Sequence, residues 1–572
     1  MEKVISKFKN LTFTEFFNSL AKHPYTCVIL LCALTLPFGL CEKSNLSKFS
    51  FIYALIVCTA ILSVVMILGK IGSDYKTSAM LFAAVFIYTA GCIYIIIKND
   101  FNISTLFWLF TIGIIVFAVI LKIGGNLNTQ TLIALMIICA IMLRLIYVLY
   151  TDSSSRQHDV GYFNFKWGHA NYIEYWYNNG LKLPDFDVRK IWQYYHPPLH
   201  HMLMALLLRI YTVLGIEYDT ACQALQILPM IYSSLCMIVS YRLFTMIKLK
   251  GVPLILAMGI VCFHPTFIIL GGAFNNDILS VLFILLSAMW ALKWYREQSF
   301  KNIIILALCI GLGMMSKLST WMIAPAVAFL FIYAFFKNIK NTKKYISQFI
   351  VFIVICAPLA LWWQIRNNIA FGVPITYVPY LSEKDVIYSG NIPLTKRLFD
   401  FTSSGQLNYV YDAFTAYGAP YNEFNPTLGL FKTAIFDEGK NGISVINFPQ
   451  IKFTGPILFY ISVILFLVCF IAFLISMFRK NSPVDKVTRI FYLIFFFVFL
   501  ISYYLFAIKY PFTCTYNIRY CVPLIVLCAM GLGLFLKDMK KQSFPSIIFK
   551  YLAYIFTFAF CFMSCVLFTQ IA

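Results

Sequence analysis

Residues 151–199 form a polar, charged and aromatic stretch between sequences that are almost wholly apolar. The stretch contains acids, histidines and an arginine, and it ends in the run Tyr195-His196-Pro197-Pro198-Leu199. Asp159 follows closely on an apolar segment, so we expect it near a membrane interface, where a partly desolvated carboxylate suits a general base. The alternative is that Asp159 caps a helix that begins at Val160.

Three cationic residues interrupt or end later apolar runs. Arg366 and Arg519 each stand at the end of an apolar run, and a guanidinium group offers two parallel N–H donors to phosphate oxygens. Lys317 lies between two apolar runs, where an unpaired charge is costly. We expect all three to contact a phosphate group. The alternative is that they snorkel to the surface, the arginines beside aromatic neighbours such as Trp363 or Tyr520.

Several other polar residues are candidates for the same site. Asp277 follows Asn276 at the start of an apolar run, where it either interacts with a helix N-terminus or acts as a second carboxylate beside Asp159. His196 is fixed in direction by two prolines, and we expect it to contact phosphate or acceptor. His169 and Glu174 are five positions apart, a spacing that does not align side chains on a helix, so we expect them at the surface. One of the two histidines at 200 and 201 is expected to face lipid headgroups.

The apolar sequence predicts the elements that carry these residues. Of 572 residues, 61% are hydrophobic and only 12% charged, and the apolar runs reach the roughly 18 residues that cross a hydrocarbon core. We therefore predict an all-α polytopic membrane protein with about fifteen spans. The predicted spans are 25–41, 51–69, 79–97, 104–121, 130–150, 222–246, 253–271, 277–295, 302–316, 319–336, 346–363, 454–477, 488–507, 516–535 and 548–569.

The distribution of lysine and arginine predicts the topology. The net charge of +22 would suggest nucleic acid in a soluble protein, but here the basic residues cluster in short loops between spans, as the positive-inside rule expects. With the N-terminus inside, residues 151–221 and 364–453 lie on the outer face. The apolar run 199–214 is then a helix in the outer interface, and a true span is the alternative. Neither outer segment contains cysteine, so a disulfide framework is not predicted.

In chain order, the polar motifs resemble those of a known family. They are His158-Asp159, Tyr195-His196-Pro197-Pro198-Leu199, Asn275-Asn276-Asp277, Ser316-Lys317-Leu318, Arg366-Asn367 with Phe371-Gly372-Val373-Pro374, and Arg519-Tyr520 with Pro523. This order resembles the GT-C superfamily, and within it the chain is most similar to the protein O-mannosyltransferase and aminoarabinose transferase group. The resemblance covers about residues 130–535 and implies a GT-C-like bundle of transmembrane helices whose outer loops carry short interfacial helices.

The resemblance implies an activity and roles for particular residues. Its members transfer a sugar from a polyprenyl-phosphate donor, and the acidic residue in the first outer loop is their catalytic base, here Asp159. His158 stands where many relatives have a second acid, so it either orients Asp159 or binds a divalent ion. A metal such as Mg²⁺ or Mn²⁺ would have Asp159, His158 and Asp277 as candidate ligands. The acceptor is a glycan, a lipid or a protein, and Tyr195 and Asn276 are expected contacts to acceptor or sugar. Apart from the resemblance, the long aromatic loop 364–453 is expected to cover the site, with Tyr417 stacking on sugar. The alternative is that its tyrosines form an aromatic belt at the level of the lipid headgroups.

The predicted spans and the resemblance together divide the chain, the basic loops predict its location, and the Lys-, Ile- and Asn-rich composition indicates a bacterial source. Residues 1–122 lie outside the resemblance and are interpreted as an accessory module of four spans. Residues 123–363 form the GT-C-like module, residues 364–453 a large outer loop over the active site, and residues 454–572 the C-terminal spans. The predicted enzyme is a bacterial, multi-pass cell-envelope protein that is surrounded by membrane lipids, acts on the outer face and inverts the anomeric centre. The alternative is a lipid-linked sugar flippase or a polytopic carrier, although the ionisable residues gather at span ends and not at the membrane midplane.

Overall fold

The computed structural model describes residues 103–125, 127–151, 159–385, 387–401, 424–437, 443, 445, 447–480, 482–539 and 544–572. The three predicted spans before residue 100, His158 and Tyr417 lie outside these residues. The chain divides into two compact units, Met1–Tyr150 with Tyr211–Ile227, and Thr151–Ile210 with Leu228–Ala572. All residues discussed as a candidate site and described by the structure belong to the second unit.

In the first unit, the described residues form three helices. Helix α6 (Ile103–Ile123) packs against α7 (Thr129–Tyr150), and α10 (Tyr218–Ala224) is the third. Helix α7 begins where Asn128 accepts a hydrogen bond from the backbone N–H of Thr131 at 2.8 Å, the arrangement of an N-cap.

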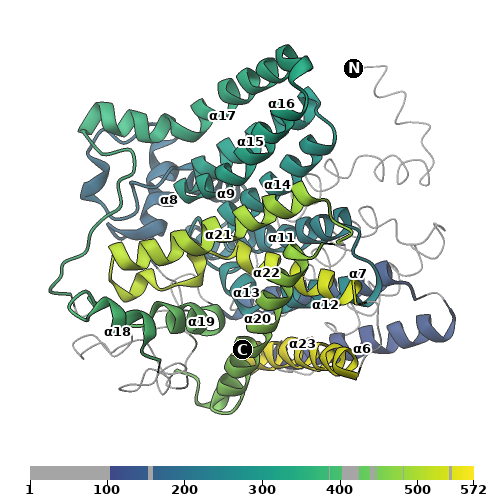
Figure 1. The fold of residues 1–572 in the computed structure, drawn as a ribbon. Helices are drawn as coiled ribbons and strands as arrows, with labels where there is room; N and C mark the ends of the chain where they lie inside the picture. The colour runs from purple at the N-terminus through teal and green to yellow at the C-terminus, as the bar shows by residue number, and fades with distance from the viewer. Residues whose placement is uncertain are drawn as a thin grey trace, which may run out of the picture. The chain divides into compact units, whose positions relative to one another are not determined.

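In the described part of the second unit, helices joined by loops are the regular elements, with one isolated bridge between Tyr388 and Phe512 and no named strand. Figure 1 shows its long helices by label and colour. They are α8 (Gly168–Asn179), α9 (Leu199–Val213, which continues into the first unit), α11 (Ile227–Met246), α12 (Gly251–Phe263), α13 (Pro265–Leu270), α14 (Asp277–Arg296), α15 (Phe300–Ser316), α16 (Ala324–Lys337), α17 (Thr342–Phe371), α18 (Leu394–Phe399), α19 (Pro426–Phe436), α20 (Thr454–Phe478), α21 (Lys486–Lys509), α22 (Pro523–Lys537) and α23 (Phe544–Ile571).

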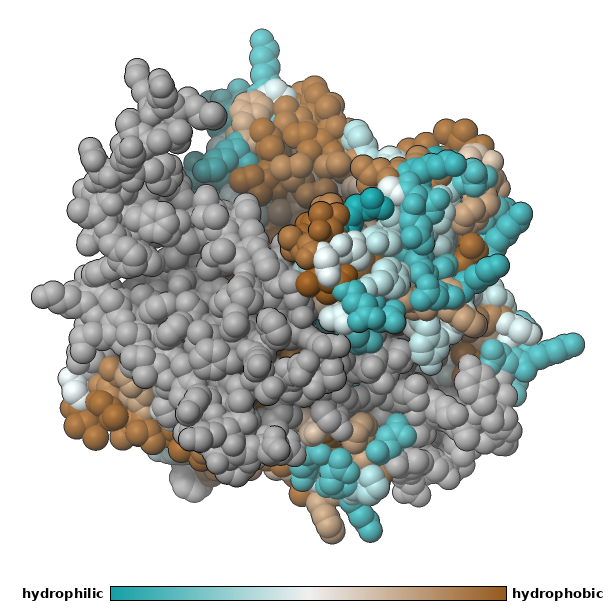
Figure 2. Space-filling model, turned by 180° about the vertical axis from the view of Figure 1, so that it is seen from behind, coloured by the Kyte–Doolittle hydropathy of each residue, from teal (hydrophilic) through white to brown (hydrophobic). Residues whose placement is uncertain are grey.

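Membrane-spanning length is reached by eight stretches within the described residues, and five more apolar helices are shorter. Large apolar side chains such as Ile353 and Val354 on α17, or Ile471 on α20, are exposed, and Figure 2 shows hydrophobic surface on the face drawn. Because a bilayer is the solvent that accepts such faces, the chain is an all-α multi-pass membrane protein, as predicted.

Three predicted boundaries differ from the structure for identifiable reasons. The predicted span 253–271 is broken between α12 and α13, because Pro265 cannot continue a helix and instead begins the next one at its first position. The predicted span 516–535 begins as helix only at Pro523, after two short 3₁₀ turns, η8 (Thr513–Thr515) and η9 (Ile518–Tyr520). Helix α17 runs on to Phe371 and ends at Gly372, whose φ of 65° is left-handed. Arg366 therefore lies within a helix.

Three helices bring the candidate site together. Helix α15 packs against both α14 and α17, and the turns at the ends of α14 and α15 carry Asp277 and Lys317. The run Leu318–Ile323 continues from Lys317 as a 3₁₀ turn, η4, that contacts α14 and α21. This packing places the ends of several helices beside one another.

Candidate active site

Asp159 lies at one end of a closed turn that leads into α8. The backbone N–H of His169 donates to the Asp159 carbonyl at 3.1 Å, and that of Ala170 donates to the Val160 carbonyl at 2.8 Å. Gly161 has φ +66°, and a Cβ on it would come closer than 3.0 Å to the Trp167 carbonyl oxygen. Only glycine accepts this conformation at such a close approach. The alternative that Asp159 caps a helix from Val160 is wrong, because the helix begins at Gly168.

The carboxylate of Asp159 forms an ion pair with Arg519. Its Oδ2 accepts from Nη1 and Nη2 of the guanidinium at 3.3 and 3.4 Å. Arg519 lies on the short turn η9, where the Asn517 side chain accepts from the Arg519 backbone N–H at 2.9 Å and fixes the turn. The side chain of Arg519 is only 9% exposed, whereas that of Asp159 is 29% exposed. The acid is therefore reachable from solvent while its cation is held inside.

Tyr520 joins this pair to a second one. Its hydroxyl accepts from Arg519 Nη2 at 3.2 Å, and its ring lies 5.1 Å from the Arg519 guanidinium and 5.3 Å from Lys317 Nζ. Both distances are within the range of cation–π attraction. The other side of the ring contacts Phe506, with centroids 4.9 Å apart. One aromatic side chain thus holds two cations that are distant in sequence.

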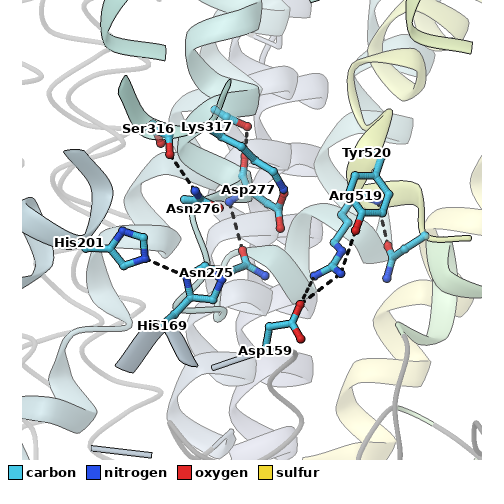
Figure 3. A network of polar contacts seen from close by, with 12 residues as sticks. Asp159, His169, His201, Asn275, Asn276, Asp277, Ser316, Lys317, Arg519 and Tyr520 are labelled. Carbon is cyan, nitrogen blue, oxygen red and sulfur yellow. Dashed lines mark hydrogen bonds and ion pairs between the residues drawn. The ribbon is translucent and has the colours of Figure 1, made fainter. Parts of the chain in front are cut away.

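Lys317 forms the second ion pair, with Oδ1 of Asp277. The lysine side chain is 12% exposed and the aspartate 2%, so this pair is largely removed from solvent. The preceding residues fix the turn: the Asn275 side chain accepts from the Asp277 backbone N–H at 3.2 Å, and Asn276 Nδ2 donates to the Ser316 carbonyl at 2.7 Å. Figure 3 shows these contacts together. Lys317 contacts an anion, but that anion is a carboxylate of the protein, and the expected contact with phosphate stays a prediction.

We call Asp159, Arg519, Tyr520, Lys317 and Asp277 the ion-pair cluster. They come from four segments of the chain that are up to 360 positions apart. The two cations both contact the Tyr520 ring, and each is paired with one acid. The formal charge of the cluster is zero. Such an arrangement preorganises two cations where an anionic group can exchange with a carboxylate.

The Tyr195-His196 element lies beside the ion-pair cluster. The two rings are 4.2 Å apart, and the Tyr195 carbonyl accepts from the Trp363 indole at 3.2 Å. Desolvation, followed by repulsion from Lys317, holds the pKa of His196 well below its usual value. Desolvation and the nearby Asp159 raise the pKa of Tyr195. His196 is therefore neutral near pH 7, able to donate or accept a hydrogen bond but without a cationic charge for phosphate.

Two predictions about neighbouring histidines are wrong. His169 is buried and shares a 2.8 Å hydrogen bond between its Nδ1 and Nε2 of His201. Both histidines at 200 and 201 are fully buried, so neither faces headgroups, and His200 Nε2 contacts the Phe274 carbonyl at 2.8 Å. Glu174 is also buried, where it accepts from the Asn164 backbone N–H at 2.9 Å. The spacing of five failed as a guide because each partner comes from another element.

Arg366 has contacts different from those of Arg519. Its guanidinium donates to the Pro184 carbonyl and, at 2.8 Å, to the Asn367 side chain, and it lies 4.9 Å from the Phe371 ring. None of its contacts is to the ion-pair cluster. In this structure Arg366 links α17 to the polar stretch 151–199 through its hydrogen bond to Pro184.

The candidate metal ligands Asp159 and Asp277 are each already paired with a cation of the protein. Among the described residues, no group of three or more histidine, cysteine or acidic side chains has the spacing that could hold a metal ion. A divalent ion would have to displace both cations, so these two residues do not fit a resident metal in the arrangement seen.

The fold and the site define a multi-pass helical membrane protein with two ion pairs joined by Tyr520. Residues 195–362 match the family described as dolichyl-phosphate-mannose-protein mannosyltransferase. The predicted resemblance to GT-C membrane glycosyltransferases is thereby confirmed over this segment. No curated protein matches the chain. Among solved structures, it is similar to the crystal structure of the Archaeoglobus fulgidus oligosaccharyltransferase complex with Zn and sulfate, at 13% identity and a TM-score of 0.42, over 76% of this chain and 53% of that one. The chain thus spans about half the length of that structure.

Proposed function

We propose that this protein transfers a sugar from a polyprenyl-phosphate donor to an acceptor hydroxyl at the outer face of the membrane, with inversion at the anomeric carbon. The observation that supports this most is the pairing of Asp159 with Arg519. It sets the proton acceptor that the reaction needs beside a cation that suits the leaving phosphate. The acceptor is a glycan, a lipid or a protein, and the outer position follows from the basic loops expected on the inner side.

The reaction is a single displacement. Asp159 takes the proton of the acceptor hydroxyl, whose oxygen forms a bond to the anomeric carbon. The bond between that carbon and the phosphate oxygen breaks, and its electron pair leaves with the polyprenyl phosphate. Arg519 and Lys317 neutralise the leaving group. Asp277 holds Lys317 in place, and Tyr195, Asn276 and Tyr417 are proposed contacts to sugar or acceptor.

Donor binding would exchange the partner of Arg519. The distances from Asp159 to the guanidinium, 3.3 and 3.4 Å, exceed the roughly 2.7–2.9 Å that charge-assisted hydrogen bonds reach. A phosphate, with more charge and more acceptor oxygens, competes well with Asp159 for this cation. The exposed Asp159 is then released toward the acceptor. His158 is proposed to orient it.

The experiment incubates the purified full-length protein with a panel of polyprenyl-phosphate sugars and follows the release of polyprenyl phosphate. Asp159→Asn should lower release by about 10²- to 10⁴-fold, the usual contribution of a general base. Asp187→Asn is the matched control, since Asp187 lies in the same polar stretch but pairs with the exposed Arg189 at 2.6 Å. Equal release by wild type and Asp159→Asn would refute the assigned base. Saturable donor binding without release by any form would favour a carrier.

A further inference from the structure

Another buried cation lies in the predicted outer segment between α17 and α19. Arg397, on the short helix α18, is only 6% exposed. The one hydrogen bond of its side chain within the described part of the chain is from Nη1 to the Tyr516 hydroxyl, at 3.4 Å. Its buried Nε has no partner there, and no described carboxylate pairs with it. A guanidinium group has five N–H donors, so most of its bonding capacity is unused.

The neighbouring hydroxyl groups do not compensate the charge. The Ser389 hydroxyl donates to the Pro511 carbonyl at 3.0 Å, so the Tyr516 hydroxyl, 2.6 Å away, donates to Ser389. The Tyr516 oxygen in turn accepts from Arg397. This chain runs in one direction and ends on a neutral carbonyl. A buried cation without a carboxylate partner is destabilising. Arg397 has no such partner among the described residues, and an anion of the right shape would provide one.

The position of this cation relates it to the ion-pair cluster. Tyr516 and Arg519 are three residues apart, which limits their Cα separation to about 11 Å. The turn that ends at Tyr516 is followed at once by the turn that carries Arg519, the partner of Asp159. A molecule whose hydroxyl lies at Asp159 can therefore carry a second group toward Arg397.

We propose that Arg397, supported by Tyr516 and Ser389, binds an anionic group of the acceptor, a phosphate or a carboxylate. The inference rests on the proposed function for its reference to an acceptor. Guanidinium binds both anions through two parallel hydrogen bonds. The acceptor class is then an anionic glycan or glycolipid, and neutral sugars are poor acceptors.

The test measures binding of matched probes to the purified full-length protein: glucose 6-phosphate and glucuronate against neutral glucose. The charged probes should bind and raise the unfolding temperature, whereas glucose should not. Arg397→Gln should weaken binding of the charged probes by about ten- to a hundredfold, the worth of a charge-assisted hydrogen bond. Lys396→Gln is the matched control, because its side chain is the exposed neighbour with the same charge. It should leave binding unchanged.

Two further measurements distinguish an anion site at Arg397 from a purely structural role and from anion binding at the ion-pair cluster. Without any anion, Arg397→Gln should unfold at the wild-type temperature or above it, because it removes an uncompensated charge. An unfolding temperature below that of the wild type would show that Arg397 stabilises the fold without an anion, and would overturn the proposal. If that variant does not fold, Arg397→Lys replaces it and should retain weakened binding. Charged-probe binding that is lost in Arg519→Gln but kept in Arg397→Gln would also overturn it, since the anion would then occupy only the ion-pair cluster. Release of polyprenyl phosphate tests the proposed function separately and needs no added acceptor, because water can supply the attacking hydroxyl in a hydrolytic side reaction.

Discussion

The position of Asp159 depends on a glycine, and replacing Gly161 by alanine tests this dependence. Gly161 has φ +66°, and an alanine Cβ would lie closer than 3.0 Å to the Trp167 carbonyl oxygen. Real Cβ atoms do not make such contacts, so the turn from Asp159 to Gly168 must open. Gly372 supplies the matched control, because its φ is +65° and a Cβ there would meet no atom within 4 Å.

The expected magnitudes separate the two substitutions. A left-handed backbone costs an L-residue roughly 1–2 kcal/mol, and both variants should lose this much stability. Gly161→Ala should lose about 1–3 kcal/mol more, the usual cost of overpacking. Because displacing a catalytic group by 1 Å lowers rates by about 10²-fold, sugar transfer by Gly161→Ala should fall about 10- to 100-fold. Gly372→Ala should retain most of the wild-type rate.

The assay compares the initial rate of polyprenyl phosphate release with the unfolding temperature for wild type and both variants. A rate loss in Gly161→Ala alone would link the turn to the position of Asp159. Equal rates and equal unfolding temperatures in the two variants would refute the reasoning. A stability loss without a rate loss would show that the turn does not position the base.

Three other perturbations have defined outcomes. Lys317→Met should destabilise the protein by about 3–5 kcal/mol by leaving Asp277 buried and unpaired, and Asp277→Asn in the same chain should recover most of this, as a double-mutant cycle of unfolding would show. Tyr520→Phe removes a hydroxyl partner of Arg519 and should lower release about fivefold, with wild-type stability within about 1 kcal/mol. Burial lowers the pKa of His169 well below 6.5, so below pH 6.5 the unfolded chain binds a proton that the folded chain does not. The free energy of unfolding should then fall by up to about 1.4 kcal/mol for each pH unit below 6.5. The unfolding temperature of His169→Gln should depend less on pH than that of the wild type.

Single residue types were predictable from the sequence where their surroundings are unusual. Asp159, Asp277, Lys317 and Arg519 each stand at the edge of an apolar run, and the structure places all four in the ion-pair cluster. A charge at a membrane edge is costly enough to signal a partner. The all-α fold follows from the same apolar runs, which leave the backbone no other way to pair its polar groups.

Partners were not predictable, because they depend on packing. Lys317 and Asp277 are 40 positions apart, and no periodicity relates them. Tyr520 was considered only as an aromatic neighbour of Arg519, although the Arg-Tyr pair was part of the resemblance. Arg397 was missed altogether. Its only signal was a cation in a predicted outer segment, and its burial depends on a contact with Tyr516, 119 positions away.

The zero formal charge of the ion-pair cluster bears on how the proposed reaction would be timed. Before donor binding, Arg519 stabilises the carboxylate form of Asp159, which makes it a weak proton acceptor. A donor phosphate that takes over Arg519 removes this stabilisation and adds a negative charge nearby, and both effects strengthen Asp159 as a proton acceptor. The base would thus become active when the leaving group is in place. The transfer of Arg519 from Asp159 to the donor phosphate thus couples proton removal to donor binding. Tyr520 contacts both cations and holds them beside each other during this transfer.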